Sequence, residues 1–191
     1  MIVNLKTNSS KLWLNKFPWK KKSDHKYSRG KVIIFGSQLN MTGSTILSSE
    51  AALRVGTGSV KIICSKKTLP IYSLKFPSAL KEEINNLNLL KKLIIKERDS
   101  IFLIGPGAGV NELTRKKTKL ILKNSKYAII DADALTCFKN NPKELYSLLD
   151  KNKIITPHIK EFHAIFPTIN KKISNYEKIV KALKKCKCNI L

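Results

Sequence analysis

Short β-branched runs alternate with segments of helical spacing from Lys31 to the end of the chain, and this alternation is the strongest constraint on the fold. The first run, at 32–35, is continuously apolar and stops at Gly36, as a strand buried on both faces does. Further strands are predicted at 59–64, 101–104, 127–130 and 153–155, and helices at 44–55, 113–122, 161–166 and 174–185. Strands that alternate with helices form βαβ units, so we predict an α/β fold with a mainly parallel sheet.

The length of 191 residues and the hydrophobic content of 42% indicate one domain with a core of its own. Residues 1–25 are polar and lysine-rich, and we interpret them as an N-terminal arm or a linker. The domain is predicted to occupy 26–191. Within it, residues 69–96 are the least regular part, and helix is favoured around 82–92.

The formal net charge of +24 raises the question of a nucleic-acid partner. Only four of the 37 basic residues are arginine, although arginine suits bidentate contacts with phosphates and bases. The lysines are scattered along the chain, and lysine-rich stretches mostly lack the aromatic residues on which bases stack. We therefore expect a solvated lysine-rich surface and no specific nucleic acid. The alternative is a basic nucleic-acid-binding protein, whose affinity would depend strongly on salt.

Lysines interrupt every apolar stretch near the N-terminus, so the hydrophobic region of a secretory signal is lacking, and no run approaches a membrane span. The four cysteines show no C-x-x-C spacing, and Cys186 and Cys188 alone cannot complete a four-ligand zinc site. We expect free thiols, a cytoplasmic location, no membrane association and no protein-bound metal.

Small and polar residues follow the predicted strands, where ligands bind in an open parallel sheet. Gly36-Ser37 and Thr42-Gly43-Ser44 follow the first strand, and the loop Gly105-Pro106-Gly107-Ala108-Gly109 follows the strand at 101–104. Glycines let a backbone approach a pyrophosphate or a flat ring, but the loop does not match the G-x-G-x-x-G fingerprint. A tight strand-to-helix turn is the structural alternative at both places.

Two carboxylates, Asp131 and Asp133, follow the strand at 127–130. They could orient a magnesium-bound phosphate or a ligand hydroxyl, or one of them could cap the next helix. His158 follows the strand at 153–155 and a proline, so its ring is expected in the same crevice. Glu161, three residues later, can hold the imidazole if the segment is helical.

Five motifs in this order resemble the NAD(P)H-hydrate dehydratase family, a branch of the ribokinase-like superfamily. They read DHKYSRGKV at 24–32, TGS at 42–44 leading to AALRVGTG at 51–58, GPGAG at 105–109, DADAL at 131–135 and TPHIKEF at 156–162. The resemblance implies a ribokinase-like three-layer sandwich. It also implies an enzyme, a carbon–oxygen lyase, that uses ADP or ATP with Mg²⁺ to dehydrate the S form of NADHX or NADPHX.

In such an enzyme, phosphorylation of the ring hydroxyl creates a good leaving group, and elimination restores the reduced nicotinamide. By position, the resemblance assigns contacts with the hydrated cofactor to Ser44, to Gly107 or Gly109, and to His158, with Asp131, Asp133 and Glu161 in support. Ser44 stands where the family usually has alanine. The resemblance further suggests a homo-oligomer and an upstream epimerase domain or protein as a partner.

The family also carries a later Gly-Thr-Gly-Asp segment whose amides form an anion hole and whose aspartate assists the chemistry. All eight glycines of this chain lie at or before Gly109, and Gly56-Thr57-Gly58 is followed by Ser59. The resemblance therefore implies a domain that is incomplete at its C-terminus, and it leaves the catalytic residue unknown. Two alternatives stay open within the superfamily, namely a non-catalytic nucleotide-binding remnant and a small-alcohol kinase.

For residues 1–191 assayed alone, we expect no appreciable dehydratase turnover. Amide donors fixed at a transferring phosphoryl group are usually the largest catalytic factor, and one donor contributes on the order of a hundredfold to a thousandfold in rate. The assay supplies NADPHX, magnesium and either ADP or ATP, and follows the return of NADPH absorbance. Robust turnover would contradict this expectation, because another group would then have to supply the anion hole.

Overall fold

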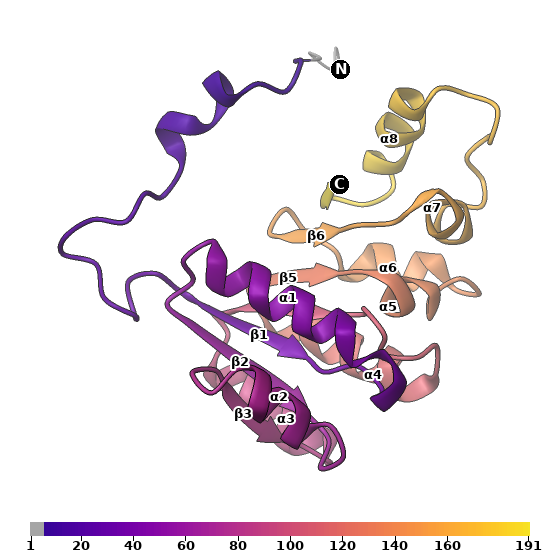
Figure 1. Cartoon of the computed structure of the whole chain (residues 1–191). Coiled ribbons are helices and arrows are strands. Elements are labelled where there is room, and N and C mark those ends of the chain that lie inside the picture. Colours follow the sequence, from indigo (N-terminus) through magenta and orange to yellow (C-terminus); the bar gives the residue numbers. More distant parts are fainter. Residues whose placement is uncertain (1–5) are drawn as a thin grey trace.

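The computed structural model describes residues 6–191, which form a seven-stranded parallel sheet with helices on both faces (Figure 1). The strand order is β3-β2-β1-β4-β5-β6-β7. The strands are β1 (Lys31–Phe35), β2 (Ser59–Cys64), β3 (Leu80–Glu83), β4 (Ile101–Ile104), β5 (Tyr127–Ile130), β6 (Lys153–Ile155) and β7 (Asn189–Ile190). The predicted α/β fold with a mainly parallel sheet is confirmed.

Two helices cover one face of the sheet and six cover the other, as the two hydrophobic clusters show. The first face carries α1 (Thr42–Arg54) and α2 (Leu69–Lys75). The second carries α3 (Leu87–Lys96), α4 (Glu112–Asn124), α5 (Ala132–Thr136), α6 (Pro142–Leu148), α7 (Ile159–Ile165) and α8 (Asn175–Leu183). The molecule is therefore a three-layer sandwich.

Side chains alternate between the two cores along each central strand. On β1, Ile33 and Phe35 join the core under α3 to α8, and Ile34 joins the core under α1 and α2. Ile62 and Ile63 on β2 divide in the same way. Because successive residues of a strand face opposite sides, a strand covered on both faces has to be apolar throughout.

The prediction of a helix around 82–92 is partly wrong. Residues 80–83 form β3, and α3 begins only at Leu87, after Asn86 caps it by accepting from the amides of Asn88 and Leu89. The sequence of β3 is charged because the strand lies at the edge of the described sheet, where Lys61 of β2 contacts Glu82 at 2.8 Å. Its pattern therefore lacks the apolar run by which buried strands are recognised.

The part of the arm that the structure describes contains two 3-10 turns, η1 (Ser10–Leu12) and η2 (Leu14–Lys16), with no buried residue in either. This part of the arm lies apart from the sheet, and the chain then continues into β1 (Figure 1). Residues 1–5 of the predicted arm lie outside the described residues. None of the helices in residues 6–191 has both the length and the apolar composition that a bilayer crossing requires.

Lys153 at the start of β6 is fully buried. Its ammonium donates to the carbonyl oxygens of Ser125 and Lys126 at 2.7 and 2.8 Å, at the turn that leads into β5. Burial lowers the pKa of Lys153. The lysine thus ties the entry of β6 to the entry of β5.

We expect Lys153→Met to lower the free energy of unfolding by roughly 1–3 kcal/mol, because the carbonyl oxygens of Ser125 and Lys126 lose a charged donor. The exposed Lys151, two residues earlier, provides the control Lys151→Met, for which we expect little change. Urea unfolding of both variants measures the difference. Equal stability of the two variants would show that the buried bonds contribute nothing net.

Candidate functional site

The direction of the chain across the sheet reverses between β1 and β4. The crossovers from β1 to β3 move toward one edge, and those after β4 move toward the other. In open parallel sheets, ligands bind beyond the carboxyl ends of the strands at such a reversal. The last residues of β1, β4, β5 and β6 stand level with one another in the strand register. The residues that come next therefore share one edge of the sheet, and they are Gly36, Gly105, Asp131 and Thr156.

The loops that follow β1 and β4 meet at the reversal. The amide of Gln38 donates to the carbonyl oxygen of Gly107 at 2.8 Å. Gly107 has a φ of +65°, and a Cβ on it would lie 2.7–2.9 Å from Met41, Ser37 and Ser44. The glycine is therefore required by the contact between the two loops, in addition to any contact that its backbone makes with a ligand.

Ser44 joins this contact from the first turn of α1. Its Oγ lies 2.9 Å from the carbonyl oxygen of Met41 and 3.1 Å from that of Pro106. The single hydroxyl proton can serve either acceptor. The side chain that distinguishes this chain from the alanine of the resembled family therefore binds α1 to the glycine loop.

Asp133 holds the same loop from the next strand end. Its Oδ2 accepts from the amide of Gly109 at 2.8 Å. Asp131 is the N-cap of α5, and its Oδ1 accepts from the amide of Ala132 at 2.8 Å. Asp131 therefore caps the helix that follows it, which was the structural alternative for this pair. Both aspartates accept a hydrogen bond from a backbone amide.

Ala132, between the two aspartates, has a φ of +46° and is the one non-glycine residue in 6–191 with a positive φ. This left-handed conformation is costly for alanine and is common at functional sites. The backbone here is also close to β4, since a Cβ on Gly105 would overlap the carbonyl oxygen of Asp131. The turn that presents the two carboxylates is therefore constrained from both sides.

His158 is the N-cap of α7, and Glu161 completes a capping box. The amide of Lys160 donates to Nδ1 of His158 at 3.1 Å, and Nε2 lies 3.1 Å from Oε1 of Glu161. Since Nδ1 accepts, the neutral ring carries its proton on Nε2 and donates it to the carboxylate. The imidazole is 60% exposed, so Glu161 orients a ring that remains open to solvent.

The sequence-predicted residues form two groups. Ser44, Gly107, Gly109 and Asp133 are joined by the contacts between the loops, and Asp131 adjoins them. His158 and Glu161 form a separate pair on α7, which packs against α5. Within the described residues, no hydrogen bond joins the two groups, so a shared crevice lined by Gly107, Gly109, Asp131 and His158 stays a prediction.

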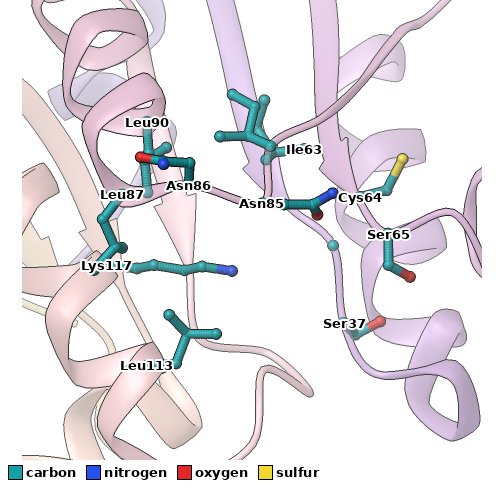
Figure 2. A pocket seen from close by; sticks show the side chains of 12 residues that line it. Ser37, Ile63, Cys64, Ser65, Asn85, Asn86, Leu87, Leu90, Leu113 and Lys117 are labelled. Atoms are coloured by element: carbon teal, nitrogen blue, oxygen red, sulfur yellow. The ribbon is translucent and has the colours of Figure 1, made fainter.

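A cavity of about 290 Å³, here called the strand-end cavity, lies beyond β1, β2 and β3 and was missed by the sequence reasoning. Its polar lining consists of Ser37, Ser65, Asn85, Asn86 and Lys117 (Figure 2). Gly36 and Ser37 belong both to this wall and to the first loop of the reversal. The available signal was Asn85-Asn86 after a strand, but β3 itself was not predicted.

Comparison with known proteins points to the same family as the five sequence motifs. The family described as NAD(P)H-hydrate dehydratase matches residues 31–191. The bifunctional NAD(P)H-hydrate repair enzyme of Dictyoglomus turgidum is 33% identical over 165 residues, which cover 79% of this chain and 32% of that protein. The ADP-dependent (S)-NAD(P)H-hydrate dehydratase of Staphylococcus aureus is 30% identical over 151 residues, 78% of this chain and 53% of that one.

Two solved structures share the fold. A ribokinase-like superfamily protein of Enterococcus faecalis superposes with a TM-score of 0.81 at 22% identity, over 99% of this chain and 68% of that one. The ADP/ATP-dependent NAD(P)H-hydrate dehydratase of Bacillus subtilis was co-crystallised with ATP and Mg²⁺. It superposes with a TM-score of 0.67 at 22% identity, over 91% of this chain and 62% of that one. The predicted ribokinase-like sandwich is confirmed.

The fold and the strand-end motifs define an α/β protein of the ribokinase-like class. Within that class, the chain belongs to the NAD(P)H-hydrate dehydratase family, because the family match spans 31–191. The chain covers about a third to a half of the length of the curated relatives described above.

We expect Gly107→Ala to lower the free energy of unfolding by roughly 1–3 kcal/mol, because the new Cβ meets three side chains and the backbone is left-handed. Gly43→Ala is the matched control, since a Cβ there meets nothing within 4 Å. In the first turn of α1, that change should be neutral or stabilising by less than about 1 kcal/mol. Thermal and urea unfolding of both variants test the contact, and equal losses would refute it.

Proposed function

We propose that this chain carries the hydrate-binding part of an ADP- or ATP-dependent (S)-NAD(P)H-hydrate dehydratase, an enzyme that repairs hydrated nicotinamide cofactors. The family match over 31–191 is the observation that carries the proposal, because it contains every strand-end motif of the reversal between β1 and β4. The ligand class is NADHX or NADPHX. Relatives that depend on ADP and on ATP both support a nucleoside phosphate as the second substrate.

The residues of the chain suit the handling of a polar, phosphorylated dinucleotide. Within the described residues, the amide of Gly107 has no acceptor, so it can donate to a ligand oxygen at the reversal. Asp133 fixes the neighbouring amide of Gly109 and with it the shape of the loop. His158 supplies an exposed imidazole whose two nitrogens are held by the amide of Lys160 and by Glu161, so its ring can contact the hydrated ring in a fixed orientation.

The nucleotide would supply the phosphoryl group that turns the ring hydroxyl into a leaving group. Mg²⁺ needs oxygen ligands and usually takes one or two carboxylates together with substrate phosphates. The described residues contain no cluster of three His, Cys, Asp or Glu side chains that could hold a metal. Asp131 and Asp133 each accept one backbone amide and keep a second carboxylate oxygen, which would hold the ion only together with substrate phosphates, and we assign no step to the ion.

An epimerase domain or protein is the partner that we propose for this activity. The relative from Dictyoglomus turgidum, which is described as bifunctional, supports that partnership. A homo-oligomer also stays part of the proposal.

We expect His158→Asn to weaken the binding of (S)-NADPHX to residues 1–191 by about tenfold or more, because it removes the oriented imidazole that the proposal places against the hydrated ring. Asparagine is a good N-cap, so α7 and the stability of the protein should be preserved. His158→Ala loses both the ring and the cap and should also unfold more easily. Calorimetry measures the binding, and thermal unfolding measures the stability.

His25→Asn is the control for the loss of an imidazole. His25 is exposed, and its Nδ1 also accepts a backbone amide, that of Ser28 at 3.2 Å. We expect this variant to bind the hydrate as the parent does. If His158→Asn also binds as tightly as the parent, the role proposed for His158 is wrong.

A further inference from the structure

Lys117 on α4 extends its side chain into the strand-end cavity, toward the side that carries Asn85 and Ser37 (Figure 2). Its ammonium has neither an ion pair nor a hydrogen bond in the part of the chain that the structure describes. Other half-buried lysines are paired, as Lys31 is with Glu97 at 2.8 Å and Lys61 with Glu82 at 2.8 Å. Burial lowers the pKa of Lys117, in keeping with the lack of an anionic partner.

The cavity around this ammonium offers donors and no carboxylate. None of the side chains that line it is acidic. Asn86 uses its Oδ1 to cap α3, and its amide nitrogen has no acceptor among residues 6–191. The Nδ2 of Asn85 donates to Glu83, which lies off the lining, and keeps a second proton.

The cavity also faces the first turn of α3, a helix of ten residues that begins at Leu87. The positive end of a helix dipole adds to the attraction for an anion, although the lysine is the principal charge. Ser37 is already saturated, since its Oγ contacts the carbonyl of Met41 and the hydroxyl of Thr45. The Oγ of Ser65 lies 3.1 Å from that of Thr68, so the side-chain donors left for a ligand are Lys117 and the two asparagine amides.

We propose that the strand-end cavity binds a phosphate monoester, with Lys117 as the charged partner of the phosphate. The volume of about 290 Å³ lies at the lower end of the range of roughly 300–1,000 Å³ usual for small-molecule sites. It suits a phosphate with a body of sugar size, and it is too small for a whole dinucleotide. The inference goes beyond the proposed dehydratase function and does not depend on it.

Two sources of such a phosphate share this chemistry. Gly36 and Ser37 separate the cavity from the reversal between β1 and β4, so a ligand bound there could extend its ribose phosphate into the cavity. A separate phosphorylated small molecule is the other source. The lysine and the asparagine amides recognise the phosphate in the same way in both cases.

The test titrates residues 1–191 with ribose 5-phosphate and, separately, with ribose, in the absence of any dinucleotide. We expect ribose 5-phosphate to bind and ribose not to bind. Lys117→Met should weaken binding of ribose 5-phosphate by about tenfold or more, since a charge-assisted hydrogen bond is lost, and Lys117→Arg should retain much of it. Lys116→Met, at the exposed neighbouring position on α4, removes the same charge and should bind like the parent.

Equal binding of ribose and ribose 5-phosphate by the parent, or parent-like binding by Lys117→Met, would overturn the proposal. Thermal unfolding checks that each variant is folded, and Lys117→Gln replaces Lys117→Met if the latter does not fold.

A loss of affinity for NADPH but not for NADH in the Lys117 variant would assign the phosphate to a dinucleotide. Undiminished binding of ribose 5-phosphate in saturating NADH would assign it to a separate molecule. Failure of (S)-NADPHX to bind would affect only the dehydratase proposal.

Discussion

Gly107 has no side chain, and the space where one would lie is filled by Ser37, Met41 and Ser44. That contact joins the loop after β1 to the loop after β4, which are the two halves of the reversal in the sheet. The backbone of Gly107 is left-handed, so both its size and its conformation exclude other residues. The glycine loop can hold a fixed position because it is packed against the first turn of α1 and bound by Asp133 through the amide of Gly109.

The central strands could be predicted because their burial on both faces leaves a continuous apolar signature. β3 could not be predicted, because an edge strand that forms ion pairs with its neighbour reads like the start of a helix. The start of α5 was only one of two alternatives left open by the sequence, since Asp131 and the strained Ala132 create it by tertiary constraint. Local pattern fails where the backbone conformation is imposed from outside the segment.

The candidate site shows the same division. Sequence reasoning found glycines, aspartates and a histidine at strand ends, since these residue types are unusual there and the sheet brings strand ends together. It could not find Lys117, which looks like any other lysine on a basic helix. Only the fold places that lysine opposite Asn85 and Asn86, which lie 31 or more positions earlier in the chain. With 13 acidic residues for 37 basic ones, most lysines must remain unpaired, and burial alone distinguishes this one.

The relative placement of the glycine loop and His158 depends on the register of three strands. Ile104 of β4 pairs with Ile130 of β5, and Ile130 pairs with Ile155 of β6. A slip of one residue would exchange the side chains of a strand between the two cores, which are packed with different residues, so core packing favours this register. The register in turn aligns Asp131 with Thr156, whose buried Oγ1 has no partner in the described residues. Each strand-end motif is thus held in place by the apolar strand before it, which is why motifs far apart in the sequence can form one edge.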